Sequence, residues 1–140
     1  MILTYRDLLD SIQARAALLH AAARNRPAAD VPPILHTDHE PALRRVIDDS
    51  AAIVARRLRL TLDHPDADTI RLIPRPDSPF YRPSATDGSD ISDGARQLIT
   101  EAILLHVLHI LASALGYPGD HLARADALLS AARPARITPW

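Results

Sequence analysis

The chain has 140 residues, of which 47% are hydrophobic, and a formal net charge of −1 at pH 7. This length and apolar content suffice for one domain with a packed core, and the near-zero charge gives no cationic excess of the kind that announces non-specific nucleic-acid binding. All of the Lys and Arg side chains are arginine, which removes lysine Schiff-base and P-loop chemistry. Cysteine is absent, which excludes disulfides, thiolate metal sites and cysteine nucleophiles.

A first helix is predicted to begin at Thr4, because Thr4 and Asp7 have the spacing of a capping box, and to end near Asn25 to Pro27. Apolar residues at intervals of three and four give it one buried face: Tyr5, Leu8, Leu9, Ile12, Ala16, Leu19 and Ala23. The segment from Pro27 to His36 contains three prolines and is predicted to be a linker.

A second helix begins either after a cap at Thr37 or with Pro41 as its first helical residue, and the sequence leaves both starts open. Its predicted inner face is Leu43, Val46, Ile47, Ser50, Val54 and Leu58. Leucines then alternate with polar residues from Leu58, and Thr69 to Ile73 is a further strand candidate, so a short two-stranded β element is possible near 58–73. Four prolines and Gly88 predict an irregular excursion over 74–93.

A third helix is predicted to begin near Asp90 or Ser92 and to end at Leu115, before Gly116 and Pro118. Its run from Ala102 to Leu115 is apolar on all sides except at two histidines, and a helix of that kind is buried. At about 1.5 Å per residue the run spans roughly 21 Å, less than the roughly 30 Å of a bilayer core. The run therefore indicates the central helix of a four-helix domain.

A fourth helix is predicted after a cap at Asp120 and before Pro134, followed by a short extended tail to Trp140. Its predicted apolar stripe is Leu122, Ala125, Leu128, Leu129 and Ala132. The expected fold is mainly α: a single helical domain over 1–140 around a central apolar helix.

Two groups of residues could bind metal. His106 and His109 lie at i and i+3 on one helix face, a spacing that can serve a metal, but partly buried core histidines have the same spacing. The run from His36 to Glu40 holds several potential ligands, and it also reads as a capping cluster at a helix start.

Partner contacts are predicted at a basic group and at three aromatic residues. Arg56, Arg57 and Arg59 form the densest basic group, which is either a solvated face or a contact for phosphate or an acidic partner. Phe80, Tyr81 and Trp140 either fold onto this domain or anchor a neighbouring chain.

The order of four segments carries a resemblance: TYRDLLDSI in the first helix, RLRLTL at the end of the second, TIRLIPRPD after it and ARITP near the C-terminus. With these the chain resembles small helical proteins from the structural-gene regions of Bacteroides-type phages and prophages, and more distantly the helical head–tail connector proteins of tailed phages. The resemblance implies a virion or assembly role through protein contacts, ring formation and no catalysis. It carries over no active-site residues.

The first functional hypothesis is therefore a non-enzymatic structural or assembly protein that needs no cofactor and binds itself or other virion or assembly proteins. We expect it in the host cytoplasm or the virion and not secreted, since MILTYRDLL lacks the pattern of a signal peptide, and we expect neither membrane nor sequence-specific nucleic-acid binding. The alternative is a metal-binding helical bundle or metal-dependent enzyme that uses His106 and His109 with His20 or His39. A DNA-binding regulator ranks last, because the helix after Gly116 has few cations.

Overall fold

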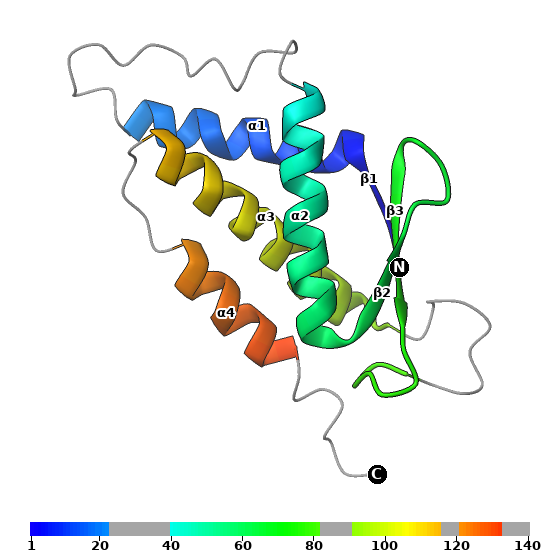
Figure 1. The fold of residues 1–140 in the computed structure, drawn as a ribbon. Coiled ribbons are helices and arrows are strands. Elements are labelled where there is room, and N and C mark those ends of the chain that lie inside the picture. Colours follow the sequence, from blue (N-terminus) through cyan, green and yellow to red (C-terminus); the bar gives the residue numbers. More distant parts are fainter. Residues whose placement is uncertain (23–39, 82–90, 116–120, 133–140) are drawn as a thin grey trace.

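The computed structural model describes residues 1–22, 40–81, 91–115 and 121–132 (Figure 1). Within these residues the chain forms four helices and one three-stranded antiparallel sheet. The helices are α1 (Tyr5–Ala22), α2 (Glu40–Leu58), α3 (Asp93–Leu115) and α4 (His121–Ala132). The strands are β1 (Ile2–Thr4), β2 (Leu60–Asp63) and β3 (Thr69–Pro74). The expectation of a mainly α, four-helix fold is confirmed.

Helix α3 is the centre of the domain and packs against α1, α2 and α4 (Figure 1). Every residue from Ala102 to Leu108 is buried, as expected of a helix that is apolar on all sides. The helix has 23 residues and is therefore about 34 Å long, longer than the apolar run from which its length was compared with a bilayer. Among the described residues this one helix is long and apolar enough to cross a membrane, over Asp93–Ser113, and 61% of its apolar window is buried in the fold.

The helix starts follow the capping chemistry of the sequence. The Asp7 amide donates to Thr4 Oγ1 at 3.2 Å, so Thr4 caps α1 as predicted. The Ala95 amide donates to Ser92 Oγ at 3.2 Å, so of the two predicted starts of α3, Asp90 and Ser92, the structure selects Ser92. Helix α2 begins at Glu40, which puts Pro41 in the first turn, where no main-chain donor is required. The competing cap Thr37 and the predicted cap Asp120 lie outside the described residues.

The sheet contains one strand more than the sequence predicted. Strand β3 is central, with β1 on one side and β2 on the other. The Leu72 amide donates to the Met1 carbonyl at 2.9 Å, and Ile2 lies opposite Arg71. Since a lone two-stranded ribbon is marginal in water, pairing with β1 and burial of Ile70 and Leu72 against the helices stabilise this hairpin.

Two further predictions are corrected by the packing. Leu122 was placed on the inner stripe of α4 but is 40% exposed, because His121, which is 6% exposed and lies four residues before Ala125, takes the buried position in the first turn. The first part of the excursion, residues 74–81, folds back on the domain: Ser78 Oγ donates to the Leu58 carbonyl at 2.9 Å and Phe80 joins the core. The linker, the rest of the excursion and the C-terminal tail lie outside the described residues.

Candidate functional site

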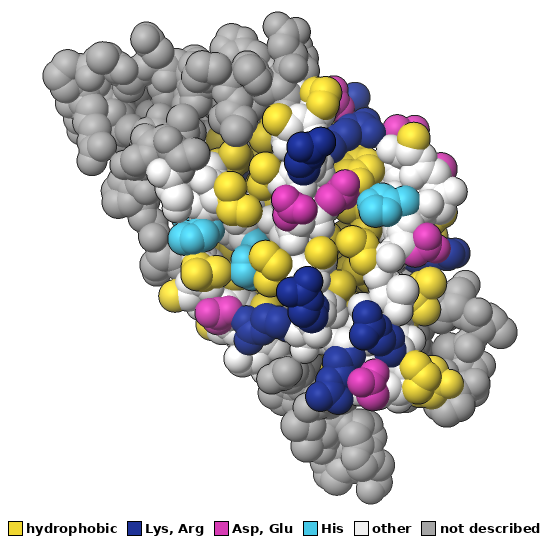
Figure 2. Space-filling model, viewed as in Figure 1, with side chains coloured by type: hydrophobic (Ala, Val, Ile, Leu, Met, Phe, Trp, Pro, Cys, Tyr) yellow, Lys and Arg dark blue, Asp and Glu magenta, His cyan; other side chains and the backbone are white. Residues whose placement is uncertain are grey.

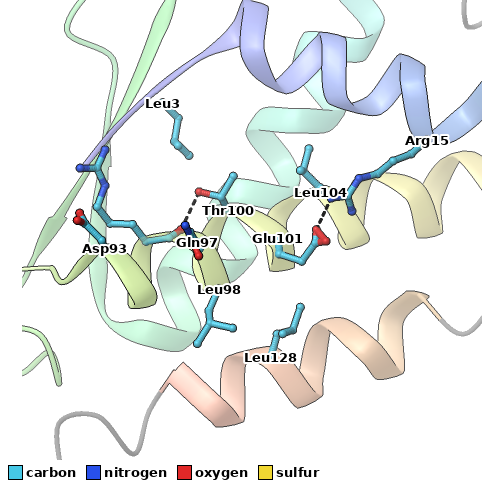
Figure 3. A pocket seen from close by; sticks show the side chains of 10 residues that line it. Leu3, Arg15, Asp93, Gln97, Leu98, Thr100, Glu101, Leu104 and Leu128 are labelled. Atoms are coloured by element: carbon cyan, nitrogen blue, oxygen red, sulfur yellow. Dashed lines mark hydrogen bonds and ion pairs between the residues drawn. The ribbon is translucent and has the colours of Figure 1, made fainter.

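A groove follows the side of α3 that faces away from α2, between α1 on one side and α4 on the other (Figure 3). It consists of two hollows, a first of about 690 Å³ and a second of about 340 Å³. We call the two together the α1/α4 groove. Three sides of α3 are thus covered by helices, and the groove marks the fourth.

The first hollow has apolar walls and a polar floor. Leu3 from β1 and Leu128 from α4 face it from opposite sides, and Leu104 lies in the floor (Figure 3). The remaining floor is polar and includes Gln97 and Thr100 from α3. A concave surface with apolar walls and a few polar groups is typical of a binding site.

The second hollow continues along α3 toward its C-terminal half. Leu105 and Leu108 line it from α3, Leu18 from the outer part of α1, and His121 and Arg124 from the start of α4. Both hollows therefore offer leucine side chains beside charged or polar ones.

An ion pair between α1 and α3 stands where the two hollows meet. Arg15 Nη2 lies 2.5 Å from Glu101 Oε2, and both residues line both hollows. The two side chains are 33% and 30% exposed. The Oε2 atom is itself buried, and its contact within the described structure is this ion pair with Arg15.

Sequence reasoning did not find the α1/α4 groove. Its floor follows one stripe of α3, through Gln97, Glu101, Leu104 and Leu108, at intervals of three and four residues. The polar residues at the start of that stripe, ahead of the apolar run, were the only sequence signal that this side of the helix is exposed. The residues of the walls could not be predicted from the sequence, because they come from distant parts of the chain.

The histidine pair is divided between core and surface. His106 is 6% exposed and its Nε2 atom has no hydrogen-bond partner among the described residues, whereas His109 is half-buried. Burial lowers the pKa of His106; the charge of Asp126 opposes this shift, and those of Arg57 and His109 add to it.

A metal site would need a third ligand. Within the described ranges no group of three His, Cys, Asp or Glu side chains is placed to hold a metal ion. Of the other ligands considered, the His20 side chain and residues 36–39 lie outside those ranges. The metal hypothesis thus has no described ligand beyond the pair itself.

The predicted partner-contact residues that the structure describes are divided between the core, an ion pair and the exposed surface. Arg57 forms an ion pair with Asp126 of α4, whereas Arg56 and Arg59 are exposed at the end of α2. Phe80 is 7% exposed and belongs to the core, so it folds onto this domain and does not anchor a neighbouring chain. Tyr81 is 41% exposed. Trp140 lies outside the described residues.

Comparison with protein families, with curated proteins and with solved structures finds no match to this chain.

Proposed function

We propose that this protein is a non-enzymatic assembly protein that binds a helical segment of a partner protein in the α1/α4 groove. The observation that carries the proposal is the open fourth side of α3 between two flanking helices. Leucine side chains in the walls of the groove, Leu3, Leu18 and Leu128, remain exposed or half-buried, and a partner helix would remove their apolar surface from water.

The dimensions of the groove support a helix as its occupant. The part of α3 that lines it runs from Asp93 to Leu108, which is about 22 Å long and matches roughly four turns of a partner helix. The two hollows lie about two turns apart along α3, so apolar anchors at i and i+7 of the partner would each enter one hollow. Between them, the carboxylate of Glu101 and the guanidinium of Arg15 offer an acceptor and donors to a polar side chain of the partner.

A finer proposal, that the protein is a head–tail connector-type subunit of a phage, rests on the resemblance of its segments alone. It predicts portal, capsid or tail genes beside its own gene. The products of those genes are then the first partners to test.

Coexpression with the products of the neighbouring genes, followed by light scattering of the purified species, tests the proposal. Thr100→Trp places a large ring in the first hollow without altering a fully buried position. Ala42→Trp is the matched control, because Ala42 is exposed in α2, on the far side of α3 from the groove. Circular dichroism of both variants serves as the test that each one folds.

The proposal expects a complex with a neighbouring gene product for the wild type and for Ala42→Trp, and an affinity at least about tenfold lower for Thr100→Trp, since a filled hollow excludes a hot-spot anchor. A complex that survives Thr100→Trp unchanged would place the contact elsewhere. A strict monomer at high concentration that no neighbouring gene product shifts would contradict the assembly role itself.

A further inference from the structure

Arg59 has an unusual main-chain conformation for its residue type. It follows Leu58, the last residue of α2, and has a φ of 57°. Helices often end with a residue in this left-handed region, but that residue is usually glycine, because a Cβ atom makes the conformation unfavourable. An arginine at this position retains a charged side chain at the expense of backbone strain, and such outliers are found at functional sites.

Main-chain hydrogen bonds bring two further arginines to the same place. The Arg59 amide donates to the Arg56 carbonyl at 3.3 Å, and the Arg75 amide donates to the Arg59 carbonyl at 3.0 Å. We call Arg56, Arg59 and Arg75 the arginine corner. A buried hydrogen bond also fixes its backbone, because the Ser78 hydroxyl donates to the carbonyl of Leu58.

The positive charge of the arginine corner is only partly neutralised. Arg59 Nη1 lies 3.7 Å from Asp77 Oδ2, and both side chains are about 60% exposed. Arg75 donates from Nε to Thr61 Oγ1 at 3.4 Å and has no ion pair with a described residue. The Arg56 side chain has neither a hydrogen bond nor an ion pair within the described structure. The three guanidinium groups of the arginine corner are therefore balanced by a single described carboxylate, that of Asp77. Figure 2 shows basic side chains gathered over the lower end of α2 and the adjoining sheet.

An exposed aromatic residue, Tyr81, follows the arginine corner along the main chain. The Tyr81 amide donates to the Ser78 carbonyl at 3.1 Å, and the Ser78 amide donates to the Arg75 carbonyl at 2.8 Å, so Tyr81 follows the corner along one chain of hydrogen bonds. Its side chain is exposed. Arginine and tyrosine are enriched where proteins bind one another, and arginine binds carboxylates in bidentate geometry.

We propose that the arginine corner binds an acidic polypeptide segment, with two or more carboxylates on Arg56, Arg59 and Arg75 and with Tyr81 against the apolar part of that segment. Charge complementarity identifies the occupant: a compact group of cations suits a few neighbouring carboxylates. A nucleic-acid strand instead requires a longer basic tract, which a chain of net charge −1 is less suited to provide. The corner lies on the α2 side of the molecule, away from the α1/α4 groove, so this proposal stands independently of the proposed function.

Fluorescence anisotropy with a labelled octaglutamate peptide, at low and at physiological ionic strength, tests the proposal. The key variant is Arg59→Gly, because glycine removes the charge and also the backbone strain. We expect octaglutamate binding to weaken about two- to fivefold, as for loss of one exposed ion pair, while the melting temperature rises by about 3 °C. A purely structural role for Arg59 predicts the reverse, a lower melting temperature and unchanged binding.

Two further variants complete the experiment. The triple variant Arg56→Gln, Arg59→Gly, Arg75→Gln is expected to weaken binding more than about tenfold, since the three contacts act together. Arg6→Gln removes an exposed arginine in the first turn of α1 and should leave binding unchanged, as should the groove variant Thr100→Trp.

Three results would overturn the assignment. The first is a wild-type protein that does not bind octaglutamate at low ionic strength. The second is equal binding by the wild type and the triple variant. The third is tighter binding of a labelled DNA duplex that the same triple variant abolishes, which would identify a nucleic acid as the occupant.

Discussion

Arg15 on α1 and Glu101 on α3 meet at 2.5 Å between Nη2 and Oε2, and this contact stands on the boundary between the two hollows of the α1/α4 groove. It joins the first helix to the central helix at the point where a partner would cross. Both side chains are about one-third exposed, so solvent screens the attraction and limits its contribution to stability.

Reversing the charge of Arg15 tests this contact. Arg15→Glu places two carboxylates against each other and is expected to lower the free energy of unfolding by about 1 kcal/mol after allowance for screening. The double variant Arg15→Glu, Glu101→Arg is expected to recover most of that loss. Urea unfolding of the wild type, Arg15→Glu, Glu101→Arg and the double variant gives the coupling energy. A double variant no more stable than Arg15→Glu would show that the pair does not stabilise the fold.

Removal of the cap of α3 is expected to destabilise the whole domain. Ser92→Ala deletes the acceptor for the Ala95 amide and should cost about 1 kcal/mol, whereas Ser92→Asp keeps an acceptor and should stay close to the wild type. Ser130→Ala, at an exposed position within α4, is the control and should change stability by less than about 0.5 kcal/mol. Equal midpoints of thermal unfolding for the two alanine variants would refute the capping role.

Much of the helical architecture could be predicted, because capping residues and apolar spacing within short segments determine it. The side chains of Thr4 and Ser92 cap the first turns of α1 and α3, so these residue types indicate where the helices begin. The apolar spacing of α1 and α2 places Ile12 and Ile47 in the core. Strand β1 escaped prediction, because three residues are too few to show an alternation and its stability comes from pairing with β3, far along the chain.

The candidate surfaces were much less predictable, because they depend on tertiary placement. The α1/α4 groove joins Leu3 to Leu128, and no local pattern brings those positions together. The densest basic group was visible as Arg56, Arg57 and Arg59, but the structure assigns Arg57 to an ion pair with α4. The left-handed conformation of Arg59 had no signal in the sequence, since the residue type disfavours it.

The centre of α3 is expected to be the part of the core most sensitive to truncation. Ile103→Ala removes three carbon atoms from a fully buried side chain and should cost about 3 kcal/mol, because the surrounding helices cannot close the cavity completely. Leu122→Ala deletes a side chain of similar size at an exposed position of α4 and should cost less than about 1 kcal/mol. Chemical unfolding measures both, and similar losses would mean that Leu122 is buried after all.

The stability of the protein is expected to decrease as the pH falls below 7, in part through His106. Burial holds the pKa of His106 below its ordinary value of 6.5, so the folded state favours the neutral imidazole. Above that value the side chain is neutral in both states and contributes no pH dependence. Below it, the unfolded chain takes up the proton first, and stability is lost until the pH reaches the lower pKa of the folded state.

The variant His106→Leu isolates this contribution. Leucine fills a similar space and removes the buried Nε2 atom, which has no hydrogen-bond partner in the part of the chain that the structure describes, so stability at pH 7 should stay within about 1 kcal/mol of the wild type. Between pH 7 and pH 5, the urea midpoint of His106→Leu should fall less than that of the wild type. Leu122→Ala, which alters an exposed residue and no ionisable group, should keep the wild-type slope. If His106→Leu also keeps that slope, His106 is protonated in the folded state without penalty, and the buried position assigned to its ring is wrong.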